Sequence, residues 1–106
     1  MKIAVASEGK DENSKVSSIS GRALYYLIFE NKKLVKAIKN PFRVGGGGAG
    51  FSVAQMVGNE EVNVVISGKF GTNIKSALEQ KGIKIFVIKN KKVKEALKDV
   101  LNKAAK

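Results

Sequence analysis

Two glycine-rich stretches hold the residues best suited to binding chemistry in this sequence. The first, "NPFRVGGGGAG" from Asn40 to Gly50, has glycine at five of its last six positions, in a chain with only eleven glycines. The second, "GKFGTN", spans Gly68–Asn73. Glycine adds backbone freedom that folding must remove, so such a run is unfavourable unless the backbone needs it. One explanation is a flexible linker; the other is a backbone cradle whose N–H groups bind a bulky anion.

Two residue types that often catalyse reactions or ligate metals are missing from the chain. It contains no cysteine and no histidine, which excludes disulfides, thiolate ligands, imidazole bases and histidine-bound zinc or iron. The acids Glu8, Asp11 and Glu12 lie in one polar segment, whereas a two-metal nuclease needs carboxylates on its central strands. We therefore expect no catalytic residue and no metal ligand, and we predict that the protein is not an enzyme.

Charge is the strongest compositional signal. Twenty Lys+Arg against nine Asp+Glu give a formal net charge of +11, and eighteen of the twenty are lysine. Residues 81–106 carry nine lysines against only Glu95 and Asp99, a balance of +7. Lysine favours diffuse attraction over the bidentate binding of phosphate or carboxylate by arginine. The charge therefore indicates either an anionic partner or simply a solvated basic surface.

The length and hydropathy of the chain limit its architecture and location. A length of 106 residues predicts one domain, with a hydrophobic fraction of 43% that is ordinary for a globular protein. No apolar run approaches the roughly 18 residues that span a membrane. The N-terminal segment predicts a strand and not a signal peptide. We expect a cytoplasmic protein without a membrane partner.

Hydrophobic patterns predict elements in the order β-β-β-α-β-α-β-α. The predicted strands are Lys2–Ser7, Arg22–Glu30, Lys33–Asn40, Val62–Ser67 and Ile83–Ile88. The predicted helical faces are Phe51, Ala54 and Val57; Ile74, Ala77 and Leu78; and Val93, Ala96, Leu97, Val100, Leu101 and Ala104. Asn31 and Lys32 form a predicted hairpin turn. Thr72 or Asn73 suits the start of the second helix, and Gly82 suits its end.

These elements predict a mixed five-stranded sheet of order 3-2-1-4-5. The first three strands form a meander with the second strand antiparallel, and the last two are parallel because a helix joins them. Four loops then leave one edge of the sheet: Ser7–Gly21, Pro41–Gly50, Gly68–Asn73 and Lys89–Lys92. Ligands of open α/β sheets usually bind at such a switch point. We therefore expect the glycine-bearing loops to converge on one crevice.

The expected crevice is basic. The cations expected near it are Lys10, Lys15, Arg43, Lys69, Lys89, Lys91 and Lys92. Two helices also begin there, and helix N-termini attract anions. Arg22 lies at the end of the first polar loop; it either contacts the ligand or binds a loop carbonyl, and the sequence leaves both roles open.

Five segments together resemble a known family. They are "MKIAVASEG" at the N-terminus, "VSSISGRALYYLIFE", "NPFRVGGGGAGFSVAQ", "VVISGKFGTNIKSAL" and "GIKIFV", in this order. In sequence and spacing they are similar to the dinitrogenase iron–molybdenum cofactor biosynthesis family, the NifX/NifY and NifB C-terminal type of domain. The resemblance spans nearly the whole chain, so that residues 1–106 resemble one nitrogenase-accessory-factor-like domain.

The resemblance implies a fold, a cargo and a site. The fold is a three-layer α/β/α, RNase H-like arrangement, and the function is non-enzymatic binding or carriage of an anionic metal–sulfur cofactor or precursor. The implied cofactor-binding residues, with the two arginines expected beside them, are Arg22, Arg43, Gly45, Gly46, Gly47, Gly48, Gly50, Gly68, Gly71 and Asn73. Because the chain lacks cysteine and histidine, an iron–molybdenum or other metal–sulfur cluster would be held noncovalently, by backbone N–H groups and by lysine or arginine.

Two other functions stay open. The charge is also compatible with a basic module that binds nucleic acid or a nucleotide, although the aromatic residues are not interleaved with lysines as stacking on bases would require. The third candidate is a regulatory protein-interaction domain without a small ligand. The expected partners are thus an anionic cluster or small anion and a protein that takes part in cofactor delivery, with nucleic acid less favoured.

Overall fold

The computed structural model of the protein describes residues 1–44 and 49–104 and shows a mixed five-stranded sheet. The strands are β1 (Lys2–Ser7), β2 (Tyr25–Glu30), β3 (Lys33–Lys39), β4 (Val64–Ser67) and β5 (Lys84–Val87). Their order is β3-β2-β1-β4-β5; β2 is antiparallel to both neighbours, and β1, β4 and β5 are parallel. The predicted order and the antiparallel second strand are confirmed.

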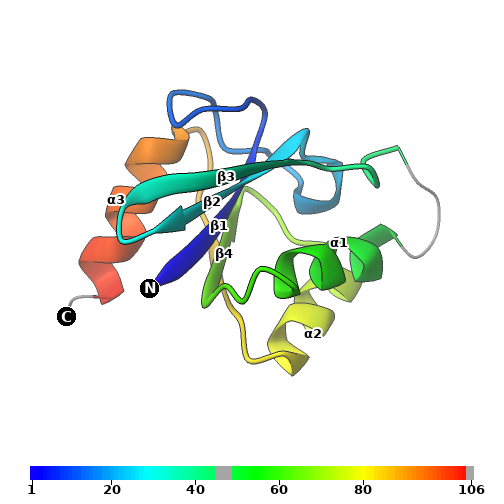
Figure 1. Ribbon diagram of the computed structural model, residues 1–106. Helices are drawn as coiled ribbons and strands as arrows, with labels where there is room; N and C mark the ends of the chain where they lie inside the picture. Colours follow the sequence, from blue (N-terminus) through cyan, green and yellow to red (C-terminus); the bar gives the residue numbers. More distant parts are fainter. Residues whose placement is uncertain (45–48, 105–106) are drawn as a thin grey trace.

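Helices cover both faces of the sheet, which gives three layers (Figure 1). The helices are α1 (Ala49–Gly58), α2 (Thr72–Gln80) and α3 (Val93–Ala104). One core lies between the sheet and α1 and α2, where Ala4, Ile28 and Val65 meet Val53 and Leu78. The other lies between the sheet and α3. Residues of a strand alternate between its two faces, so a strand that is buried on both faces is apolar along its whole length. The sequences of β1 and β4 are such apolar runs.

The amphipathic pattern of α3 is confirmed, whereas that of α1 was predicted wrongly. Val93, Ala96 and Val100 are fully buried against the sheet. In α1, however, Phe51 is 55% exposed, and Val53 takes its place on the buried face beside Ala54 and Val57. The short α1 pattern allowed two registers of the apolar face, and only the position of the sheet selects one.

The segment before β2 also differs from the prediction. Ser20–Arg22 forms a short 3₁₀ helix, η1, and the strand begins only at Tyr25, so Arg22 does not start it. Asn40 lies just beyond β3, and its buried side chain donates hydrogen bonds to the carbonyl oxygens of Gly21 and Ala23. Side chains thus satisfy carbonyl groups in and next to η1 that a strand would have paired in the sheet.

Turn and cap chemistry is partly as predicted. Asn31 and Lys32 have φ of 51° and 71°, which forms the tight hairpin turn between β2 and β3. Gly82, with φ of 76°, ends α2 as predicted. The predicted cap by Thr72 or Asn73 is wrong: Gly71 is the N-cap of α2, and no side chain caps this helix end. The predicted strands at β4 and β5 are also slightly too long.

No helix among the described residues is both long and apolar enough to cross a membrane.

The buried Tyr26 phenol generates the first prediction. Its hydroxyl donates a hydrogen bond to the carbonyl oxygen of Ser20, which fastens η1 to the core. Tyr26→Phe leaves this carbonyl with only a long hydrogen bond of 3.4 Å from the Ala23 N–H, and we expect the free energy of unfolding to fall by about 1–2 kcal/mol. Urea denaturation near pH 8 measures this loss.

The same variant has a distinct pH dependence. Burial raises the pKa of the Tyr26 phenol above its ordinary value of 10.0, while the side chain of Ser20 acts in the opposite direction. The folded protein therefore holds this proton more tightly, so the resulting stability is complete below pH 10 and is lost as the pH rises above it. We expect wild type to lose more stability than Tyr26→Phe between about pH 8 and pH 11. Parallel losses would contradict this assignment.

A close backbone contact generates the second prediction. A Cβ atom on Gly68 would lie 2.9 Å from both the Ser17 carbonyl oxygen and the Ser18 Cα, whereas one on Gly21 would meet nothing within 4 Å. We expect Gly68→Ala to cost about 1–3 kcal/mol of stability through overpacking. The matched variant Gly21→Ala should be neutral or stabilising by up to about 1 kcal/mol. Equal midpoints in urea for the two variants would show that the contact imposes no constraint.

Candidate anion-binding site

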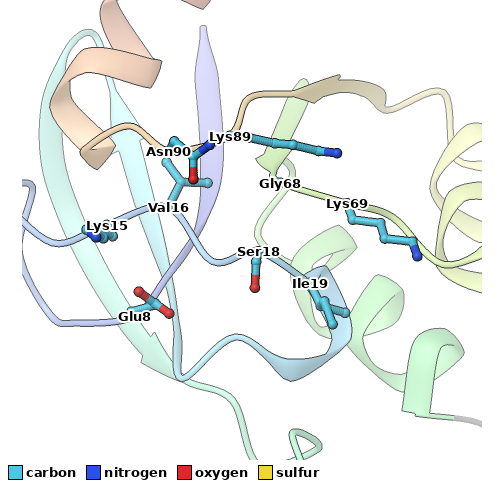
Figure 2. A pocket seen from close by; sticks show the side chains of 9 residues that line it. All are labelled: Glu8, Lys15, Val16, Ser18, Ile19, Gly68, Lys69, Lys89 and Asn90. Carbon is cyan, nitrogen blue, oxygen red and sulfur yellow. The ribbon is translucent and has the colours of Figure 1, made fainter.

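A pocket of about 440 Å³ lies at the edge of the sheet where the parallel strands β1, β4 and β5 end (Figure 2). The loops that follow these three strands form its walls. The lining residues are Glu8, Lys15, Val16, Ser18, Ile19, Gly68, Lys69, Lys89 and Asn90. The structure therefore shows the predicted convergence of the loops that follow these strands.

Backbone hydrogen bonds hold the walls of this pocket together. The Ser17 N–H donates to the carbonyl of Ala6 at 2.8 Å, and the Gly68 N–H donates to the carbonyl of Ser17, also at 2.8 Å. The Val16 N–H donates to the carbonyl of Lys91 at 3.0 Å, which ties the first loop to the connection between β5 and α3. The close approach of two backbone segments is therefore sufficient to require glycine at position 68.

The pocket has a surplus of positive charge. Lys15, Lys69 and Lys89 line it together with one acid, Glu8. In Figure 2, Lys69 and Lys89 extend in the same general direction from the ends of β4 and β5, while Glu8 and Lys15 come from the opposite wall. Within the described part of the chain, none of these four side chains forms a salt bridge. The ammonium groups of the three lysines are thus available to an anionic ligand.

The N-termini of α1 and α2 lie side by side close to this pocket. A Cβ atom on Gly50 would be 3.3 Å from the backbone nitrogen of Ile74 and 3.4 Å from the Asn73 Cβ, so glycine allows the two first turns to approach. Neither helix has an acid in its first turn, and no side chain caps α2. Their aligned peptide dipoles therefore leave two partial positive charges near each other.

The short helix η1 connects these two regions. Ile19 lines the lysine pocket, and the Ser20 N–H donates to the carbonyl of Lys69 at 2.9 Å. Arg22 Nη1 donates to the carbonyl oxygen of Arg43 at 3.2 Å, in the segment that leads to the glycine run. Of the two roles open for Arg22, the bond to a loop carbonyl is thus present. Contact of either arginine with a ligand stays a prediction.

The predicted site residues fall into three groups. Gly68 lines the lysine pocket; Gly50, Gly71 and Asn73 lie at the helix N-termini; Arg22 and Arg43 bridge η1 and the next loop. The predicted residues Gly45, Gly46, Gly47 and Gly48 lie outside the described residues. The sequence predicted a single crevice. In the described residues, the structure instead has a lysine pocket with the N-termini of two helices beside it.

Three of the lysines expected at this edge do not line the pocket. Lys10 Nζ lies 5.9 Å from the centre of the Tyr25 ring, and Lys91 Nζ pairs with the Asp99 carboxylate at 2.5 Å. Lys92 also does not line the pocket, although it forms an isolated β-bridge with the lining residue Lys15.

The sequence did not identify Ser18, Ile19 or Asn90 as pocket residues. Asn90 adopts a φ of 59°, which turns the chain after β5 into the pocket wall. Asparagine tolerates this left-handed conformation, so the segment Lys89–Lys92, "KNKK", weakly indicates a turn. Nothing in the local sequence placed this turn opposite Ser18, because that juxtaposition depends on contacts between distant segments.

Comparisons with known proteins identify the family of the chain. A family model described as "Dinitrogenase iron-molybdenum cofactor" matches residues 1–103. No functionally curated protein matches the chain.

Solved structures share the fold. The apo form of the orange protein from Desulfovibrio gigas superposes with a TM-score of 0.90 at 25% identity, covering 96% of this chain and 88% of that chain. A NifB-type protein from Thermotoga, described as belonging to the DUF35 family, gives 0.83 at 26% identity, covering 95% and 87%. A dinitrogenase-type protein from Methanocaldococcus jannaschii gives 0.69 at 17% identity, covering 97% and 89%, which supports the fold alone. With its match over residues 1–103, this chain belongs to the dinitrogenase iron–molybdenum cofactor family.

Proposed function

We propose that this protein binds and carries an anionic metal–sulfur cofactor or one of its precursors, and that it does so without catalysing a reaction. Membership of the iron–molybdenum cofactor family supports the class of cargo. The observation that carries the proposal is the junction of two neighbouring helix N-termini, of which α2 has no side-chain cap, with a three-lysine pocket through η1. Such a surface attracts anions through backbone N–H groups and through lysine charge together.

The side chains available determine how the cargo is held. The chain has no cysteine and no histidine, and the described residues contain no group of three acids that could hold a metal. The protein therefore offers N–H and ammonium donors, which suit the sulfide surface of a cluster and not its metal ions. We infer that the cargo arrives with the coordination of its metals already complete.

The proposed binding residues combine the predicted set with the pocket. They are Arg22, Arg43, Gly45 to Gly48, Gly50, Gly68, Gly71 and Asn73, together with Lys15, Lys69 and Lys89. Within this set, the lysines supply long-range attraction and the helix ends supply short hydrogen bonds. A carrier also needs a partner protein that delivers or receives the cargo.

The third prediction concerns retention of a metal–sulfur anion. Protein prepared anaerobically is mixed with tetrathiomolybdate or with isolated iron–molybdenum cofactor and passed through a gel-filtration column. We expect molybdenum and sulfide to elute with the protein in a fixed ratio, and visible absorption of the bound anion to persist. Retention should weaken as salt is raised, because exposed charges are screened.

Variants distinguish the contribution of the helix N-termini to retention from that of the lysine charges. Gly71→Ala should preserve the fold, since its Cβ meets only the Ile74 Cγ2, at 4.0 Å, yet it places a methyl group at the open end of α2. Both Gly71→Ala and Lys69→Ala/Lys89→Ala should weaken retention about tenfold, equivalent to about 1.4 kcal/mol. The control Lys84→Ala, at the opposite edge of the sheet, should change it little.

Three outcomes contradict the proposal. They are loss of both probes from the wild-type protein, equal retention by all variants, and displacement of the probe by DNA at equal phosphate concentration. The last outcome would favour a nucleic-acid-binding module instead.

A further inference from the structure

The two faces of the sheet are covered unequally. Two helices pack on one face, but α3 alone packs on the other, over β1 in the middle of the sheet. On β3, Ala37 is paired with the buried Leu27 and so lies on the α3 face, yet it is exposed. Leu34 is only half-buried against the same core. Among the described residues, therefore, α3 leaves β3 partly uncovered on this face, although Leu27 and Phe29 of β2 are buried.

A groove of about 350 Å³ runs along α3 on this side. Its apolar floor is formed by Leu97 and Leu101, one turn apart on the helix. Glu12 lies at the end where α3 begins, and Lys32 of the β2–β3 turn lies at the other end. Figure 1 shows this hairpin beside α3. On α3 the lining runs from Lys94 to Asn102, so the groove follows about 12 Å of the helix.

Lysines form the rim of the groove. Lys32, Lys94 and Lys98 line it, and in the part of the chain that the structure describes their ammonium groups make no salt bridge or hydrogen bond. The two acids of α3 are engaged elsewhere: Glu95 accepts a hydrogen bond from the Lys92 N–H, and Asp99 pairs with Lys91. Three cations thus surround an apolar floor, with Glu12 as the one acid in the lining.

We propose that this groove binds an acidic amphipathic helix of a partner protein. Its apolar stripe would lie on Leu97 and Leu101, and its carboxylates would face Lys32, Lys94 and Lys98. The partner helix would take the place next to α3 that is vacant on this face, and would so complete a second pair of helices around the sheet. This surface is separate from the pocket at the carboxyl edge, so the inference does not depend on the proposed cargo.

The chemistry of the groove favours this occupant over two others. Nucleic acid is disfavoured because the floor is aliphatic and offers no ring on which a base could stack. A second copy of the chain is disfavoured because each copy carries a formal net charge of +11. An acidic helix with leucines at every third and fourth position matches both the floor and the rim.

A single-cysteine variant tests the inference. Since the chain contains no cysteine, Asn102→Cys gives one labelling position in the groove for an environment-sensitive fluorophore. The probe is a 14-residue synthetic helix with leucine at helical spacing and glutamate at the other positions. Two matched peptides carry lysine in place of glutamate, or the same residues in an order without an apolar stripe. We expect saturable binding of the first peptide only.

Charge reversal shows whether the groove itself binds the peptide. In the labelled protein, Lys94→Glu/Lys98→Glu should weaken binding at least about tenfold, because two attractive contacts become repulsive. The control Lys81→Glu/Lys84→Glu makes the same change in net charge away from the groove and should change affinity less than about twofold. Leu101→Gln should also weaken binding, and circular dichroism of each variant checks the fold.

Four results would overturn the inference. The first is equal weakening by both double variants, which would reveal only long-range attraction. The second is equal binding of the peptide without an apolar stripe. The third is displacement of the peptide by single-stranded DNA, which would point to nucleic acid. The fourth is a signal that changes with protein concentration in the absence of peptide, which would point to a second copy.

Discussion

The contact between Gly68 and Ser17 constrains the whole carboxyl edge of the sheet. The Gly68 N–H donates to the Ser17 carbonyl at 2.8 Å, and a Cβ at this position would clash with the same oxygen. Through this contact the long loop after β1 lies across the end of β4. The same loop also bonds to the start of α3, where the Val93 N–H donates to the Ser14 carbonyl at 2.8 Å. Three segments distant in sequence therefore form one rigid rim, because backbone groups leave little freedom in distance or direction.

Two surfaces of the protein carry lysines in different chemical surroundings. At the carboxyl edge, lysines stand near open helix N-termini, where small and highly charged anions are favoured. Along α3, lysines instead surround leucines, which favours a larger ligand with an apolar side. The acids of α3 matter here, since Glu95 and Asp99 are used within their own segment and do not neutralise the groove. A cargo and a partner helix would consequently occupy separate places on the molecule.

Much of the fold could be predicted because it depends on local patterns. The apolar spacing of α3, the turn at Asn31 and Lys32, and the end of α2 at Gly82 all follow from side-chain and backbone preferences of a few residues. Predictions were wrong where a distant segment chose between local alternatives. Phe51 was placed in the core although the sheet selects Val53, and Arg22 was placed in a strand although Tyr26 and Asn40 hold its segment as η1.

The sequence by itself determined the sheet order, the excess of lysine and the absence of any thiol or imidazole, and these limit the site to hydrogen bonds and charge. Only the tertiary structure decided which cations belong together. Lys15, Lys69 and Lys89 line one pocket, whereas Lys10 lies over Tyr25 and Lys91 pairs with Asp99. The physical reason is that a lysine side chain is long and has no strong local preference, so its surroundings are set by the long-range backbone contacts that position its loop.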